Sequence, residues 1–393
     1  MSVAQRVPRG VWMLGFVSLF MDVSSELIHS LLPVFMVASL GASMLFVGVV
    51  EGVAESAAMI VRVFSGAISD YFGKRKGLAV LGYSLGALSK PIFALALTVN
   101  WVLAARLIDR IGKGIRGAPR DALVADLTPP EIRGAAYGLR QTLDTVGAFT
   151  GPLLAVALMV LWAGEFRTVF WVAVIPAALA VVLLVFGVKE PRAIAPRRRL
   201  QSPIHWHTLA ALGGSYWWIV AVGAAFTLAR FSEAFLILRA REFGLADSFA
   251  PIVLVVMNVA YAMSAYPFGR LADQLDHRAL LCGGLAVLVV SDVVLAEARG
   301  LGVTVIGVLL WGLHMGMTQG LLSTMIAGAA PERLRGTAFG LFGLVSGVAM
   351  LIASMLAGLL WDKVGAATTF YAGAAFAAIS LAILLRRWRL HAG

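Results

Sequence analysis

Long apolar runs recur along this 393-residue chain and decide what it can fold into. Each run has about 20 residues, enough for a helix to cross the roughly 30 Å hydrocarbon core of a bilayer. Hydrophobic residues make up 60% of the chain and charged residues only 13%, which is not the balance of a soluble globular protein. We therefore expect an all-α membrane protein. Twelve transmembrane helices are predicted near residues 11–38, 45–66, 77–98, 101–125, 134–162, 167–188, 209–238, 249–269, 279–297, 301–328, 336–361 and 367–386.

The basic residues predict the orientation of these spans. With the N-terminus in the cytoplasm, 17 Lys and Arg residues fall in or beside the cytoplasmic connections and five in the external ones. Cytoplasmic loops carry such an excess, so we expect a multi-pass protein of the plasma (cytoplasmic) membrane with both termini in the cytoplasm. Because the net charge of +11 gathers in these loops, it does not indicate a nucleic-acid partner.

Several classes of chemistry have no support in the sequence. The single cysteine, Cys282, excludes an internal disulfide and a cysteine-based metal cluster. No metal-ligand set and no nucleophile with a base stands in a workable setting, so we expect no enzyme, no metal and no cofactor. The first span is too long, and too interrupted by Asp22, Glu26 and His29, for a cleaved signal peptide.

The chain repeats itself in two halves. "GAISDYFGKRK" at 66–76 returns as "GRLADQLDHRA" at 269–279, and "PPEIRGAAYGL" at 129–139 returns as "APERLRGTAFGL" at 330–341. Repeats on this scale build many secondary transporters, with a site where the halves meet. We expect an N-terminal six-helix bundle at 1–188, a basic cytoplasmic linker at 189–208 and a C-terminal six-helix bundle at 209–393.

With these two halves the sequence resembles the major facilitator superfamily over essentially its whole length. The loop signature G-x-x-x-D-x-x-G-[RK]-[RK] is matched by Gly66, Asp70, Gly73, Lys74 and Arg75, and in part by Gly269, Asp273 and Arg278, with Asp276 at the second glycine position. The resemblance implies twelve helices in two pseudo-symmetric bundles. It also implies that these loops form a cytoplasmic gate, in which small residues let helix ends approach and the aspartate pairs with cations or a helix N-terminus.

A glycine-proline motif in the fifth span is similar to the g-x-x-x-G-P motif of drug and metabolite antiporters in this superfamily. It consists of Gly147, Gly151 and Pro152. The resemblance implies export. The family motif usually continues with a glycine pair, whereas leucine and alanine follow here. The alternative interpretation is close helix packing, for which G-x-x-x-G is common in membrane helices.

Charged residues inside the spans need partners or water, because each costs on the order of 3 kcal/mol at the bilayer centre. In the first span Asp22, Glu26 and His29 share one helix face, and Arg140 with Asp144 forms an i, i+4 pair in the fifth. In the C-terminal half Arg230 with Glu233 is predicted to form a local pair within a helix.

The fourth span is the most charged. At 100° per residue its seven charges, Arg106, Asp109, Arg110, Lys113, Arg116, Arg120 and Asp121, occupy an arc of about 140°. The sequence from Gly112 to Gly117 fits the dinucleotide pattern G-x-G-x-x-G, but it lies inside a membrane-length helix and not between a strand and a helix, so we expect no nucleotide. Arg106 resembles the arginine of the family's R-x-x-q-G-x-g pattern, which implies a role in substrate or proton handling.

Two interpretations of these charges stay open. In the first, the acids of the first two spans neutralise the arginines of the fourth and only stabilise the bundle. In the second, Asp22 and Glu26 exchange protons while Arg106 and Arg110 hold an anionic or zwitterionic solute. The candidate substrate and proton pathway consists of Asp22, Glu26, His29, Glu51, Glu55, Arg106, Asp109, Arg110, Lys113, Arg140 and Asp144.

The sequence thus predicts a secondary active transporter that works by alternating access, with proton-coupled export of a small solute, a drug or a metabolite. One alternative is proton-coupled uptake of an anionic metabolite or metal chelate, and a remote one is a non-transporting receptor or scaffold. The expected partners are the solute, protons and the lipid bilayer. A monomer is expected.

Overall fold

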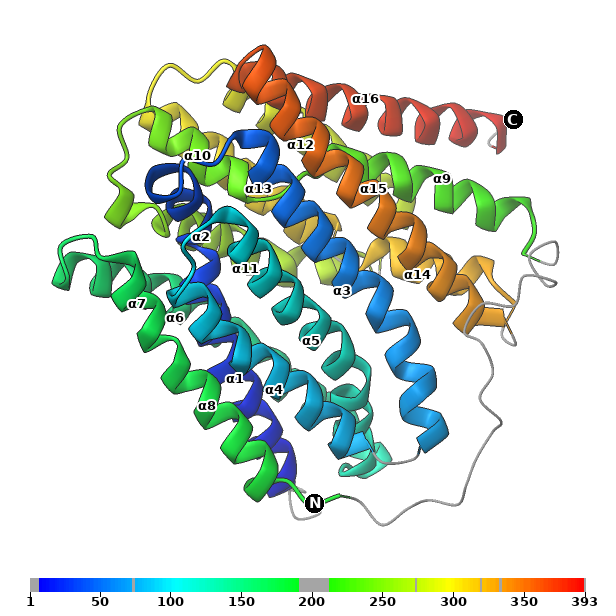
Figure 1. Cartoon of the computed structure of the whole chain (residues 1–393). Helices are drawn as coiled ribbons and strands as arrows, with labels where there is room; N and C mark the ends of the chain where they lie inside the picture. Colours follow the sequence, from blue (N-terminus) through cyan, green and yellow to red (C-terminus); the bar gives the residue numbers. More distant parts are fainter. Residues whose placement is uncertain are drawn as a thin grey trace. The chain divides into compact units, whose positions relative to one another are not determined.

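The computed structural model describes residues 7–72, 75–190, 212–272, 274–318, 320–331 and 334–391, and every regular element in these ranges is a helix (Figure 1). The all-α prediction is therefore confirmed. The elements are α1 (Arg9–His29), α2 (Leu32–Val34), the π-helix η1 (Phe35–Ser39), α3 (Met44–Phe72), α4 (Arg75–Ala94), α5 (Val99–Asp126), η2 (Pro130–Ile132), α6 (Arg133–Leu161), α7 (Phe166–Val172), α8 (Val174–Val182) and the π-helix η3 (Leu183–Gly187). They continue with α9 (Gly214–Ala229), α10 (Ala234–Glu242), η5 (Asp247–Phe249), α11 (Ile252–Ala272), α12 (His277–Ala296), α13 (Leu301–Thr318), α14 (Leu321–Ala329), α15 (Arg335–Lys363) and α16 (Ala366–His391).

The predicted spans correspond to these helices. Within the described ranges, 11 helical stretches are long and apolar enough to cross a membrane. The remaining predicted span is α5, which has 28 residues and hence ample length, but which carries the charges described above. The chain is a multi-pass membrane protein in which one membrane-length helix is far more polar than the rest.

Several predicted spans are interrupted helices and not continuous ones. In the first, α1 gives way to α2 and then to the π-helix η1. In the tenth, Gly320 has φ +77°, in the left-handed region that suits glycine, and separates α13 from α14.

The break in the seventh span corrects the prediction for Arg230 and Glu233. The helix α9 ends before Arg230, whose φ of −109° and ψ of 76° are not helical. The hydroxyl of Ser232 then accepts a 3.2 Å hydrogen bond from the backbone N–H of Ala234, where α10 begins. Arg230 and Glu233 therefore lie at a helix break and not inside a helix, and the Ser232 hydroxyl gives the backbone a local hydrogen bond in place of a helical one.

The chain divides by its contacts into two compact units, which are described separately. Unit 1 comprises Met1–Leu32 and Ala57–Ser202, and unit 2 comprises Pro33–Ser56 and Pro203–Gly393. Most of the predicted linker at 189–208 lies outside the described residues.

In unit 1, α4 packs against α5, and α1 packs against α6 and α8. The closest approach is between Gly82 of α4 and Gly112 of α5. A Cβ atom at either glycine would lie 2.6 Å from the carbonyl oxygen of the other, so the two backbones touch. Gly114 meets α3 in the same way, since a Cβ there would lie 2.9 Å from the Ala58 carbonyl oxygen. These glycines of the apparent dinucleotide pattern thus lie within α5 and allow helices to pack closely.

In unit 2, α12 packs against α13 and α16, and α9 packs against α15 and α16. Two aspartates cap helices here. Asp276 accepts a 3.0 Å hydrogen bond from the Arg278 N–H at the start of α12, which accounts for an aspartate where the family loop has glycine. Asp362 of α15 accepts hydrogen bonds of 3.0 and 2.8 Å from the N–H groups of Met44 and Leu45, at the start of α3.

Candidate functional site

One face of α1 carries hydroxyl and imidazole groups into the interior of unit 1. Ser18, Ser25 and His29 lie on this face, and each contacts a different residue of α4 or α5. The Ser18 hydroxyl lies 3.1 Å from the Tyr83 hydroxyl. The polar stripe of α1 therefore faces two neighbouring helices and not lipid.

Lys90 of α4 and Asp109 of α5 form the centre of a buried charge cluster. The ammonium of Lys90 donates to Asp109 Oδ1 at 2.7 Å and to the Ser25 hydroxyl at 3.0 Å. The Ser89 hydroxyl reaches the same carboxylate oxygen at 3.5 Å, and Arg110 Nε lies 3.9 Å from Oδ2. Since the exposed fractions of Lys90 and Asp109 are 1% and 2%, this ion pair is shielded from solvent.

Arginines surround that pair. Arg106 is buried and its Nη2 lies 2.6 Å from His29 Nδ1, so the family-type arginine contacts α1. The guanidinium of Arg116 lies over the Tyr83 ring, 4.7 Å from the ring centroid. We use the name buried charge cluster for His29, Lys90, Arg106, Asp109, Arg110 and Arg116.

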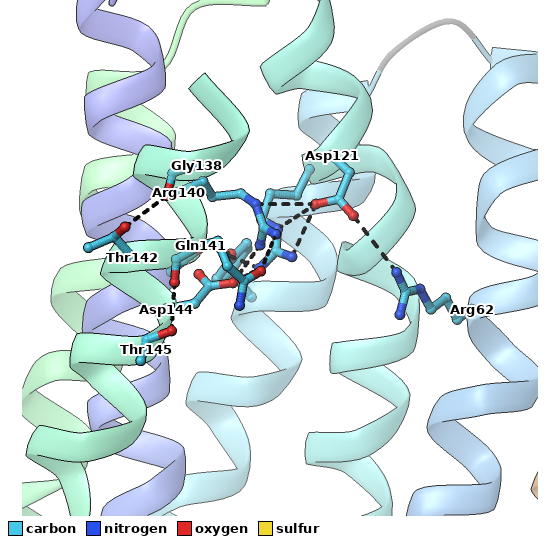
Figure 2. Close-up of polar contacts among 11 residues, drawn as sticks. Arg62, Asp121, Gly138, Arg140, Gln141, Thr142, Asp144 and Thr145 are labelled. Atoms are coloured by element: carbon cyan, nitrogen blue, oxygen red, sulfur yellow. Dashed lines mark hydrogen bonds and ion pairs between the residues drawn. The ribbon is translucent and has the colours of Figure 1, made fainter. Parts of the chain in front are cut away.

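A second polar group, the Asp121 cluster, lies further along α5 (Figure 2). It consists of Arg62 of α3, Arg120 and Asp121 of α5, and Arg140 and Asp144 of α6. Asp121 has arginine nitrogens at 3.1 Å from Arg120 and at 3.8 Å from Arg62 and from Arg140. One carboxylate thus draws together arginines from three helices.

The predicted Arg140–Asp144 pair forms within α6 at 2.5 Å. Asp144 also lies 3.8 Å from Arg120, which joins the pair to α5. Arg120 in turn donates a 3.2 Å hydrogen bond to the Ser18 hydroxyl of α1. The two clusters therefore meet along the same face of α1.

Asp22 and Glu26 lie beside the glycine motif of α6. A Cβ at Gly147 would lie 2.8 Å from the Leu19 carbonyl oxygen, and one at Gly151 would lie 2.8 Å from the Glu26 Cβ. The motif thus brings the α1 and α6 backbones into contact, with Pro152 buried next to it. Both acids are half-buried, and neither makes a hydrogen bond or ion pair within the part of the chain that the structure describes.

Three other candidate pathway residues lie elsewhere. Glu51 is buried and Glu55 half-buried on the first part of α3, which belongs to unit 2. Lys113 is exposed, although rotation along the helix predicts it on the charged face with Arg106 and Arg110, which are buried. The charged arc of α5 is therefore buried over only part of its surface.

The candidate gate residues are partly described. In the first copy Arg75 donates to Asp126 Oδ2 at 2.5 Å, and Asp70 lies on α3. A Cβ at Gly66 would lie 3.6 Å from the Ala118 Cβ, which is an ordinary van der Waals contact. In the second copy Gly269 lies on α11 with open space around it, and the Arg278 guanidinium lies 6.0 Å from the Trp218 ring centroid. Gly73, Lys74, Asp273 and the side chain of Asp70 lie outside the part of the chain that the structure describes.

Sequence reasoning missed the neutral partners of these charges. Ser18, Ser25, Tyr83 and Ser89 all contribute to the two clusters, although none was a candidate. The available signal was the spacing of Ser18, Asp22, Ser25 and His29, which fall on one helical face.

Most of the buried charged side chains of unit 1 are cations. Of the charged side chains that the structure describes as buried there, five are cations (Lys90, Arg106, Arg110, Arg116 and Arg140) and one is a carboxylate, Asp109. Within the same described ranges of the chain, no group of three or more His, Cys, Asp or Glu side chains is placed to hold a metal ion. Guanidinium groups are suited to hydrogen-bond a negative group, which can be a carboxylate of the protein or one of a solute.

Comparisons with known proteins agree with this architecture. The family model described as Major Facilitator Superfamily matches residues 14–239 and 226–391. The MFS-type transporter MJ1317 of Methanocaldococcus jannaschii is 31% identical over 389 residues, which cover 97% of this chain and 95% of that protein. The multidrug resistance protein MdtH of Photorhabdus laumondii is 32% identical over 170 residues, 43% of this chain and 41% of MdtH. A crystal structure of the nucleoside transporter NupG shares the fold, with a TM-score of 0.77 at 12% identity over 96% of this chain and 98% of that one.

Proposed function

We propose that this chain, which belongs to the major facilitator superfamily of membrane transporters, exports a small solute in exchange for protons. The solute would be a drug or a metabolite. Transport would follow alternating access, in which the two six-helix bundles at 1–188 and 209–393 expose a common path to each side in turn. The proposal assigns the chain no enzymatic activity, metal or cofactor.

The proposed proton coupling rests on the partial burial of Asp22 and Glu26 and on their lack of ion-pair or hydrogen-bond partners among the described residues of the chain. Charged groups of both signs, Asp144, Lys113, Arg116 and Arg120, act on Asp22. A partly exposed carboxyl group among such charges is suited to gain and lose a proton as helices move.

The direction of transport has separate support. The glycine motif with Gly147, Gly151 and Pro152 resembles that of antiporters, and part of the chain is similar to a protein named for multidrug resistance. Both favour export.

Reconstituted protein tests the coupling. Liposomes with an internal pH-sensitive dye would be exposed to ethidium as a cationic probe and to carboxyfluorescein as an anionic one. We expect proton movement that depends on a transported probe in the wild type, and its loss in Asp22→Asn combined with Glu26→Gln. Glu131→Gln is the control, because Glu131 is an exposed acid of the same unit. Proton-linked movement that survives the double substitution would refute the role of these two acids.

A second function, uptake of an anionic metabolite or metal chelate, is favoured by the arginines of the buried charge cluster, because guanidinium groups bind carboxylates well. Citrate and ferric citrate are suitable probes. If they bind the buried charge cluster, they should raise the melting temperature of the wild type but not of Arg106→Ala with Arg110→Ala. Arg241→Ala, which removes a half-exposed arginine of unit 2, is the control. Accumulation of labelled citrate in cells would favour uptake, and its faster loss from preloaded cells would favour export.

The proposed orientation places both termini in the cytoplasm of a cytoplasmic-membrane monomer. In a Cys282→Ala background, a cysteine in place of Glu131 should react with an impermeant thiol reagent only after the cells are opened. A cysteine in place of Arg299 should react in intact cells. The reverse pattern would overturn the orientation.

A further inference from the structure

Asp292 of α12 is a fully buried acid in unit 2 that the proposed function does not use. Its exposed fraction is 0%, and neither carboxylate oxygen has a hydrogen-bond partner. A Cβ at Gly373 of α16 would lie 2.6 Å from Asp292 Oδ2 and 2.9 Å from the Phe231 ring. The glycine leaves room for the carboxyl group and the ring, and for little else.

Aromatic rings form the surroundings of this acid. Phe231, in the break between α9 and α10, has ring centroids of Phe235, Trp311 and Phe370 at 5.7, 5.4 and 5.5 Å. Trp361 extends the layer through Phe235 at 5.7 Å and Phe370 at 6.1 Å. Asp292 therefore lies next to an apolar layer, not in a polar one.

Arg230, beside Phe231 in the break, has its guanidinium 5.6 Å from the Phe226 ring centroid, and three other charged or titratable groups of the neighbouring elements make hydrogen bonds elsewhere. Arg239 of α10 donates to the carbonyl oxygens of Leu295, Ala296 and Ala298 and pairs with Glu242. Glu297 bonds with Tyr371 of α16, and His314 of α13 bonds with the Gly284 carbonyl. In the described ranges, no cation neutralises Asp292 and no donor satisfies it.

A negative carboxylate is strongly disfavoured in such a place, because burial removes its hydration and nothing replaces it. A bound proton removes the charge. With no exposed surface and a close contact at Gly373, the site excludes larger ligands such as a hydrated cation or an organic ammonium group.

We propose that Asp292 is a proton-carrying site of unit 2, loaded in the described conformation and released to water when the aromatic layer opens. A pocket of about 460 Å³ in unit 2 is lined in part by Arg241, Glu242, Asp247 and Trp361. Trp361 belongs both to the pocket and to the aromatic layer, so a movement of this side chain gives water a route toward Asp292. A role of Asp292 in coupling proton movement to solute transport rests on the proposed function.

Infrared spectroscopy of the purified protein tests the loaded state. At neutral pH the wild type should show the carbonyl stretch of a neutral carboxyl group, with the expected shift in D2O, and Asp292→Asn should lose it. Asp276→Asn is the matched control, since it changes the exposed cap of the same helix and asparagine also caps helices well. If Asp292→Asn does not purify, Asp292→Glu should shift the band. A band unchanged by substitution at position 292 would overturn the proposal.

Transport assays test the release. An asparagine side chain cannot carry a proton, so the variant Asp292→Asn should still exchange labelled solute across liposomes without a gradient, while losing accumulation driven by a pH gradient. Gradient-driven accumulation at the wild-type level in this variant would overturn the coupling role. If the wild type itself shows no proton-driven flux, the proposed function fails, while the infrared result still decides whether Asp292 binds a proton.

Discussion

Lys90 and Asp109 meet at 2.7 Å between α4 and α5, with side chains that are 1% and 3% exposed. The other buried charges around the pair are arginines, of which Arg110 lies 3.9 Å from Asp109. Lys90 makes the closest contact with Asp109, and a buried ion that loses such a partner loses its hydration without full compensation.

We expect Lys90→Met to destabilise unit 1 strongly, by about 3–5 kcal/mol, because it leaves Asp109 without its ammonium partner. Adding Asp109→Asn should recover part of the loss. Melting temperatures of the two single variants and the double variant in detergent measure this coupling.

The pair Arg241–Asp247 is the matched control. Its atoms are also 2.7 Å apart, but the side chains are 32% and 36% exposed. Removing either partner there should cost about 1 kcal/mol or less. Equal losses for the two pairs would contradict the view that burial makes the Lys90–Asp109 pair critical.

Two glycines of α6 test whether close packing against α1 stabilises the protein. Gly147→Ala should lower the melting temperature, because the added Cβ would lie 2.8 Å from the Leu19 carbonyl oxygen. A Cβ added at Gly138 on the same helix would meet nothing within 4 Å. Gly138→Ala should therefore be neutral or stabilising by up to about 1 kcal/mol. A neutral Gly147→Ala would show that α1 and α6 can separate freely.

The cap that Asp362 provides for α3 should contribute about 1 kcal/mol to stability. Asp362→Ala removes both acceptors of the Met44 and Leu45 N–H groups, whereas Asp362→Asn keeps one amide oxygen. Melting temperatures should therefore fall in the order wild type, Asn, Ala. An alanine variant as stable as the wild type would mean that water satisfies these groups.

Tyr83 has two separable contacts. Tyr83→Phe keeps the ring beneath Arg116 and loses only the hydroxyl contact with Ser18, for an expected cost of about 1 kcal/mol. Tyr83→Leu also removes the ring, and the cation–π contact adds roughly 0.5–2 kcal/mol to the loss. Equal melting temperatures for the two variants would assign the ring no electrostatic role.

Much of the fold could be predicted because the length and hydrophobicity of a segment identify a membrane helix in the sequence. Helix breaks could not be predicted as well. The break at residues 230–233 contains no proline or glycine, and the local hydrogen bond from the Ala234 N–H to the Ser232 hydroxyl has no signal in the hydrophobic pattern. The break at Gly320 had a local signal, since glycine tolerates the positive φ found there.

The sequence identifies which charged residues form the candidate site, but it does not show which of them contact one another. Rotation along α5 places Asp109 and its arginines on one face, but which cation meets Asp109 depends on the register of α4 against α5. That register is set where Gly82 and Gly112 touch, a contact between residues 30 apart in the chain that no periodicity reveals. The role of Asp22 and Glu26 in proton exchange stays a prediction.

Asp121 has a consequence of another kind. Its carboxylate is shared by Arg62, Arg120 and Arg140, and these belong to α3, α5 and α6. Arg120 and Arg140 also reach Asp144, so α5 and α6 keep an ion-pair link when the Asp121 charge is lost. Arg62 loses its ion pair with Asp121 in that event, so the charge of this one acid decides whether α3 is tied to the other two helices.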